Sequence, residues 1–68
     1  MASLRIMNSN GSPASCLRVI IKCPGAWGYG LTDAQGRVEI PSVPDEGTVI
    51  IQGETVFMGQ LSGIIYLP

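Results

Sequence analysis

Turn-forming residues recur at short intervals along this chain, and their spacing limits what it can fold into. Asparagine, aspartate, proline and glycine close each apolar segment after only a few residues, and no apolar pattern with the helical period continues for a useful length. We therefore predict an all-β protein, a small β-sandwich of six or seven short antiparallel strands or a small barrel. The turn clusters fall at 8–13, 24–25, 33–36, 41–47 and 53–54.

The segments between the turns alternate as half-buried strands do. In the segment 16–23, Leu17, Val19 and Ile21 share one face with Cys23, while Cys16 and Ile20 lie on the other face with the two basic residues. Sixty-eight residues make one domain, so we assign 1–68 to a single sandwich. The expected strands are 4–7, 16–23, 27–32, 37–41, 48–52, 55–61 and 63–68.

Several of these strands are apolar on both faces, and Ile20 and Phe57 are examples. Charged residues make up only 13% of the chain, against about 25% in a typical soluble protein. A small sandwich normally exposes one face of each strand to water and keeps that face polar. We therefore expect part of the apolar surface to contact another chain, in a homo-oligomer or with a partner protein.

The stretch GAWGYG at 25–30 holds the only tryptophan and a tyrosine among glycines. Alternation places Trp27, Tyr29 and Leu31 on one face and Gly28 and Gly30 on the other. The favoured interpretation is that both aromatic rings pack into the core, where large rings contribute most burial. The alternative is a binding face for a glycan or peptide, with Trp27, Tyr29, Phe57 and Ile20 as candidate ligand or subunit contacts.

The segment that follows, Asp33-Ala34-Gln35-Gly36, predicts a hairpin corner. Asp33 is expected to accept backbone amide hydrogen bonds, and Gly36 to take a positive φ. Both residues are therefore structural. The glycines at 25, 28 and 30 do not form a phosphate loop, since no helix follows them.

Composition argues against several classes of function. The four basic residues are scattered and the net charge is −1, which does not suit a nucleic-acid-binding protein. No apolar run is long enough to span a membrane, and no signal peptide is visible, so a native N-terminus predicts a cytoplasmic protein. The two cysteines are seven residues apart and histidine is absent, so we expect no metal site and no cofactor, and two small half-buried cysteines.

The same residues argue against an enzyme. Without histidine, acid–base catalysis would depend on a carboxylate, a cysteine or the single lysine. Asp45 and Glu46 are adjacent loop carboxylates, Glu39 is expected on a solvent face, and neither cysteine has an evident base partner. We expect no catalytic residues.

Two longer stretches resemble the transthyretin-like, or prealbumin-like, family and carboxypeptidase regulatory-like domains. LRIMNSNGSPASCLRVII has that family's strand, Asn-to-Pro turn, small residue and second strand, and LTDAQGRVEIPSVPDEGTVII has its Thr-Asp-x-x-Gly signature before a proline turn. The resemblance covers about residues 3–52 and implies a prealbumin-like sandwich. The histidines and the C-terminal Tyr-Arg-Gly-Ser of its hydrolase branch are missing. The lysine–asparagine crosslink of its adhesin branch would have only Lys22 and Asn8 or Asn10, with Glu39 or Glu54 as proton shuttle.

These observations favour a small non-catalytic module that binds or assembles, self-associating through apolar strand faces. The alternatives are an accessory domain that binds a carbohydrate or peptide through Trp27 and Tyr29, and a small structural subunit of a larger enzyme or phage-type complex.

Overall fold

The computed structural model describes residues 1–68 as seven β-strands in two sheets, with no helix. The strands are β1 (Ala2–Met7), β2 (Arg18–Cys23), β3 (Ala26–Leu31), β4 (Arg37–Ile40), β5 (Glu46–Ile51), β6 (Glu54–Gln60) and β7 (Ser62–Tyr66). The predicted all-β sandwich is confirmed. Most of the strand boundaries differ from the predicted ones by one or two residues.

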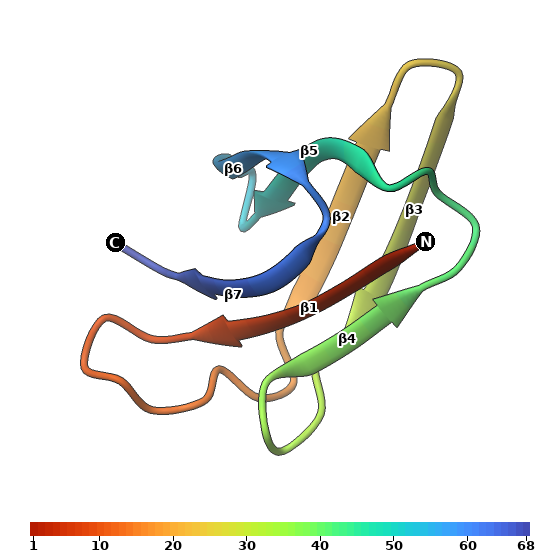
Figure 1. The fold of residues 1–68 in the computed structure, drawn as a ribbon. Coiled ribbons are helices and arrows are strands. Elements are labelled where there is room, and N and C mark those ends of the chain that lie inside the picture. The colour runs from red at the N-terminus through yellow and green to blue at the C-terminus, as the bar shows by residue number, and fades with distance from the viewer.

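Sheet A has the order β4-β1-β7 and sheet B the order β3-β2-β5-β6 (Figure 1). Sheet B is antiparallel throughout, and its β2–β3 and β5–β6 pairs are local hairpins. In sheet A, β1 is antiparallel to β4 but parallel to β7. This parallel pair differs from the antiparallel arrangement predicted for all strands, because β1 and β7 lie far apart in the sequence and no turn connects them.

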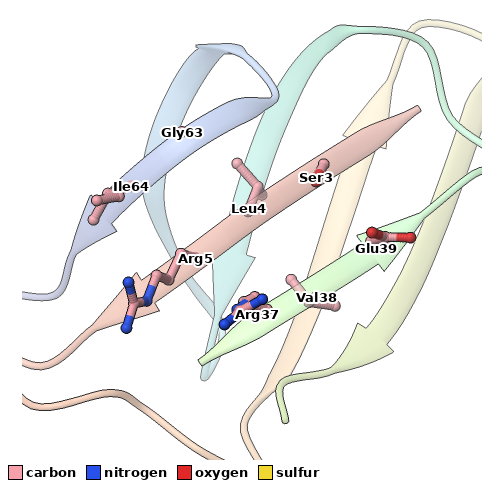
Figure 2. Close-up of a pocket in the computed structure, with 8 residues that line it drawn as sticks. All are labelled: Ser3, Leu4, Arg5, Arg37, Val38, Glu39, Gly63 and Ile64. Carbon is pink, nitrogen blue, oxygen red and sulfur yellow. The ribbon is translucent and has the colours of Figure 1, made fainter. Parts of the chain in front are cut away.

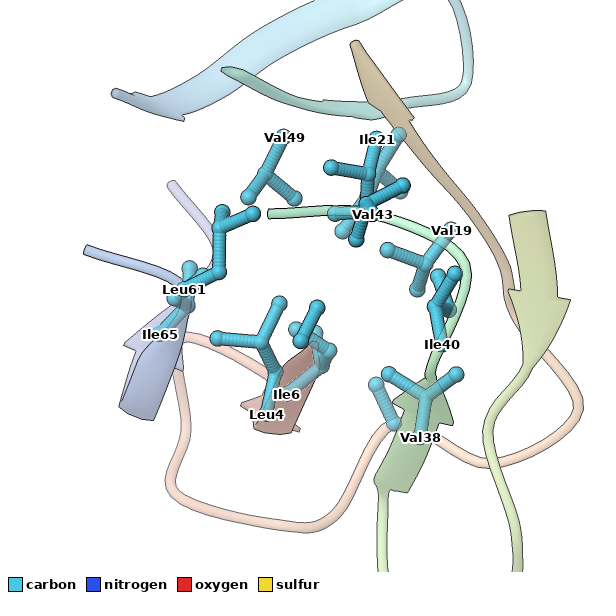
Figure 3. Packing of buried hydrophobic residues seen from close by; sticks show 13 residues of the cluster. Leu4, Ile6, Val19, Ile21, Val38, Ile40, Val43, Val49, Leu61 and Ile65 are labelled. Carbon is cyan, nitrogen blue, oxygen red and sulfur yellow. The ribbon is translucent and has the colours of Figure 1, made fainter. Parts of the chain in front are cut away.

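The core lies between the two sheets and is built from aliphatic side chains (Figure 3). β1, β2, β4 and β5 contribute alternate residues to it, as half-buried strands should, and β7 contributes Ile65 alone. Leu61, between β6 and β7, and Val43, between β4 and β5, are also fully enclosed. The cluster comprises Ala2, Leu4, Ile6, Ala14, Val19, Ile21, Val38, Ile40, Val43, Val49, Ile51, Leu61 and Ile65.

Two local predictions are wrong. Cys16 is not in a strand but in a turn, with φ of 55°, because the chain bends there before β2 begins at Arg18. The β5–β6 hairpin turns at Gln52–Gly53 rather than Gly53–Glu54. Both Gln52 and Gly53 have positive φ, at 55° and 79°, which is the backbone of a two-residue type I′ hairpin turn.

Thr32 is the one buried polar residue, and it joins the end of β3 by hydrogen bonds to the loop between β1 and β2. Its hydroxyl donates to the Ala14 carbonyl and accepts a hydrogen bond from the Leu17 amide at 2.9 Å. Every buried side-chain nitrogen and oxygen atom has a hydrogen-bond partner, so the core holds no unsatisfied polar side chain.

Candidate binding surface

β3 turns its smallest residues toward the core and its largest toward solvent. A Cβ on Gly28 would lie 2.7 Å from Cγ2 of Ile40, and one on Gly30 would lie 2.9 Å from Cγ2 of Val38. The opposing sheet therefore approaches β3 too closely for any side chain on this side. Strand alternation then directs Trp27, Tyr29 and Leu31 outward.

The expectation that Trp27 and Tyr29 pack into the core is wrong. Their side chains are 65% and 63% exposed, and Leu31 beside them is 65% exposed. The predicted alternation of aromatic residues and glycines in β3 is confirmed, but the side that faces the core is the one with the glycines. The aliphatic cluster between the sheets is closed without any aromatic ring from β3.

The two aromatic rings lie nearly parallel, with an interplanar angle of 18° and centroids 6.0 Å apart. Together with Ile20 and Arg18 of β2 they line a shallow hollow of about 290 Å³. The structure thus brings three of the four predicted contact residues together: Trp27, Tyr29 and Ile20. Ile20 lies directly across from Tyr29 in the β2–β3 register.

Phe57, the fourth, does not join them. A register irregularity between Val49 and Ile50 puts a bulge in the facing strand β6, and there Phe57 pairs with the buried Val49. Phe57 is only partly exposed and packs against the core cluster. A bulge of one residue cannot be recognised in strand alternation, so the inward position of Phe57 could not be predicted from the sequence.

The register extends the exposed apolar surface across sheet B. One row runs from Tyr29 through Ile20 to Ile50, and the next from Trp27 through Lys22 and Thr48 to Met58, which is 72% exposed. We call this the outer face of sheet B. It consists of Arg18, Ile20, Lys22, Trp27, Tyr29, Leu31, Glu46, Thr48, Ile50, Thr55, Met58 and Gln60. The alternation of β2, β5 and β6 indicates the other members of this face. It does so only once the buried side of β3 is known.

Asp33 and Gly36 form the predicted corner between β3 and β4. The Asp33 carboxylate accepts hydrogen bonds from the backbone amides of Gln35 and Arg37, both at 2.9 Å. The bond from Arg37, more than that from Gln35 and the nearby arginine charges, lowers the pKa of Asp33 below its ordinary 3.8. Gly36 has φ of 79°, and a Cβ there would clash with the Ile6 carbonyl oxygen. Both residues therefore have the geometry expected of a structural corner.

The outer face of sheet A carries charged residues on β1 and β4 (Figure 2), although Ile64 and Tyr66 of β7 are also exposed in this sheet. Arg5 lies opposite Arg37, and Ser3 opposite Glu39, in the β1–β4 register. Arg5 donates from Nε to the Gln35 carbonyl at 3.1 Å, and no ion pair joins these arginines to Glu39. The single salt bridge of the structure, at 3.2 Å, joins the Met1 amino group to Asp45.

Both cysteines are free thiols. Cys16 is exposed rather than half-buried, which corrects the prediction, because its turn holds it outside the core. Cys23 is half-buried, and its thiol donates to the Glu46 carbonyl at 3.1 Å. No three histidine, cysteine, aspartate or glutamate side chains gather in a group that could hold a metal ion.

The fold and this surface define a small two-sheet β-sandwich with a pair of stacked, exposed aromatic rings on sheet B. Comparisons with protein-family models, with curated proteins and with solved structures found no match. The structure contains no helix of the length and apolarity needed to cross a membrane.

Proposed function

We propose that this chain is a non-catalytic assembly module, a prealbumin-like sandwich that self-associates with Trp27 and Tyr29 in the contact. One observation carries the proposal: two large aromatic side chains lie exposed on sheet B while an aliphatic core closes without them. Exposed apolar groups gathered on one face are typical of interaction sites. Aromatic residues are also the ones most enriched in protein interfaces.

The whole outer face of sheet B is smaller than a standard stable interface, so a contact that uses any part of it should be weak and depend on concentration. Four strands at about 4.8 Å spacing and six residues at about 3.3 Å each give a face roughly 20 Å on a side. That footprint is smaller than the roughly 800 Å² per partner of a standard stable interface. We therefore expect monomers and oligomers to interconvert with protein concentration.

Sedimentation velocity over a range from low micromolar to high micromolar concentration tests this proposal. We expect the mean mass to rise with concentration, and the emission of the single tryptophan to shift to shorter wavelength as Trp27 leaves water. Tyr29→Ala should weaken association. Tyr66→Ala is the matched control, since Tyr66 is equally exposed, at 62%, but belongs to sheet A. A strict monomer at high micromolar concentration would refute self-association.

A second candidate function is the binding of a carbohydrate or peptide, and the ring geometry favours it. Two nearly parallel rings beside Ile20 and Arg18 offer a stacking platform with one hydrogen-bonding cation. Titration of Trp27 fluorescence with a panel of glycans and peptides tests this. An emission spectrum that no ligand changes would exclude the panel members as ligands.

A further inference from the structure

β3 is an edge strand with one side of its backbone unpaired. It pairs only with β2, across the two-residue turn Pro24–Gly25, with Cys23 opposite Ala26. The residues that flank such a turn form a hydrogen-bonded pair, and bonded pairs then recur at every second residue. The hydrogen bond from the Thr32 amide to the Leu17 carbonyl, at 3.0 Å, agrees with this two-residue repeat.

The even-numbered residues of β3 therefore bond to β2, and the odd-numbered residues direct their backbone groups away from the sheet. Trp27, Tyr29 and Leu31 each present one N–H and one carbonyl at the free edge. None of the turn and loop hydrogen bonds of the backbone uses these groups. The residues with exposed side chains are thus also those with unpaired backbone groups.

The other three edges of the sandwich carry features that oppose strand pairing. β6 contains the bulge opposite Val49 and Ile50. β4 has four residues, two of them charged, and Pro41 follows it. β7 departs from regular strand geometry at Gly63, whose φ is 96°. β3 has no proline, charge or bulge over its six residues.

The β3 sequence is complementary to itself in an antiparallel pair. When two copies are centred on Tyr29, the odd-numbered residues meet as bonded pairs, with Trp27 opposite Leu31 of the second copy and Tyr29 opposite its own equivalent. Every exposed side chain then meets an apolar one, and no like charges oppose each other on the two strands. Three such pairs supply six backbone hydrogen bonds.

The charges on sheet B favour this lateral contact over stacking of two outer faces. The outer face carries three charged residues: the cations Arg18 and Lys22 on β2, and Glu46 at the start of β5, on the same side as Thr48. Stacking would enclose all six of these charges, four cations and two carboxylates, in a desolvated contact, which is costly. Lateral pairing leaves Arg18 and Lys22 on β2, outside the ladder and in water.

We propose that two copies of this chain pair through the free edge of β3, antiparallel and centred on Tyr29, to form a continuous eight-stranded sheet. This inference rests on the proposed self-association and specifies its geometry. The pairing also places two Trp27–Tyr29 pairs on one continuous face.

Variants that place opposite charges at position 29 test whether the two β3 strands pair with Tyr29 at the centre. Tyr29→Lys and Tyr29→Glu should each raise the dimer dissociation constant at least about tenfold, because like charges then face each other across the two-fold axis. A one-to-one mixture should restore dimers, since position 29 faces its own equivalent. Met58→Lys with Met58→Glu is the control on the far strand of sheet B. The proposal would be overturned if a one-to-one mixture of Tyr29→Lys and Tyr29→Glu stays monomeric. It would also be overturned if mixing Met58→Lys with Met58→Glu restores dimers to the same extent.

The backbone contact has its own measurement. Amide exchange followed by NMR should show the Gly28 and Gly30 amides protected at every concentration, and those of Trp27, Tyr29 and Leu31 protected only as dimer forms. Tyr29→Pro removes one edge N–H from each copy and should weaken the dimer about tenfold more than Tyr29→Ala does. A proline is tolerated where an edge N–H faces solvent.

The outcomes separate the two proposals. If the wild type dimerises but the three odd-numbered amides stay unprotected, self-association stands and edge pairing is wrong. If the wild type is monomeric at every concentration, both are wrong. Protection of the three amides only after an unrelated extended peptide is added would also overturn the pairing of two copies.

Discussion

On its inner side β3 has only alanine and two glycines, whereas on its outer side it carries the largest side chains of the sheet. The inner side lies against Val38 and Ile40 of the opposing sheet, with no room for a methyl group on either glycine. The outer side leaves Trp27 and Tyr29 nearly two-thirds exposed. Side-chain size alone therefore does not determine which face of a strand is buried. The distance between the sheets does.

The largest effect should come from the buried neighbour of this strand. Ile21 is fully buried opposite Gly28, whereas Ile20 lies one residue away on the outer face. We expect Ile21→Ala to lower the free energy of unfolding by about 2–5 kcal/mol, through lost burial and a cavity. The same change at Ile20 should cost within about 1 kcal/mol. Chemical denaturation of both variants measures the contrast, and equal losses would contradict the assignment of faces.

The next largest effect on stability should come from adding a methyl group at Gly28, and it should exceed the effect of removing the whole ring of Tyr29. Gly28→Ala would force a methyl group against Cγ2 of Ile40 and should destabilise the fold by about 1–3 kcal/mol. Tyr29→Ala, which removes a whole ring from the next residue, should cost less than about 1 kcal/mol in the monomer. Thermal unfolding at low micromolar concentration compares the two. A more stable Gly28→Ala protein would show that the sheets are farther apart than described.

A smaller effect should come from the corner that holds β3 to β4. Because hydrogen bonding lowers the pKa of Asp33 in the folded chain, its carboxylate stabilises the fold above the ordinary pKa of 3.8. That contribution should be lost as the pH falls through the lower folded value. Asp33→Asn should therefore be less stable than the wild type at pH 7, with the difference shrinking toward pH 2. A difference that stays constant over this range would show that the charge is not involved.

The smallest effect on stability is expected at Trp27. Trp27→Ala should change the unfolding free energy of the monomer by less than about 1 kcal/mol, since the ring is mostly exposed and outside the core. Its effect should appear instead in association, measured by sedimentation at high concentration. Loss of stability without any change in association would show that the ring supports the fold rather than a contact.

Strand alternation predicted much of this arrangement. It separated Trp27 and Tyr29 from the glycines, and the Asp33–Gly36 sequence predicted its corner from local turn chemistry. It did not predict which side of β3 is buried, because that depends on how closely β4 of the other sheet approaches. The inward position of Phe57 was missed for a similar reason, since a bulge changes the phase of alternation without a sequence mark.

The parallel pairing of β1 with β7 has a consequence for folding kinetics. Both hairpins of sheet B join neighbouring segments, so they can form by closing short loops. Sheet A has no such local step, because its central strand needs β4 from the middle of the chain and β7 from near its other end. Closing long loops costs entropy before any contact offsets it, and such topologies fold slowly. We expect sheet B to form first, with docking of β7 beside β1 as the late and rate-limiting event.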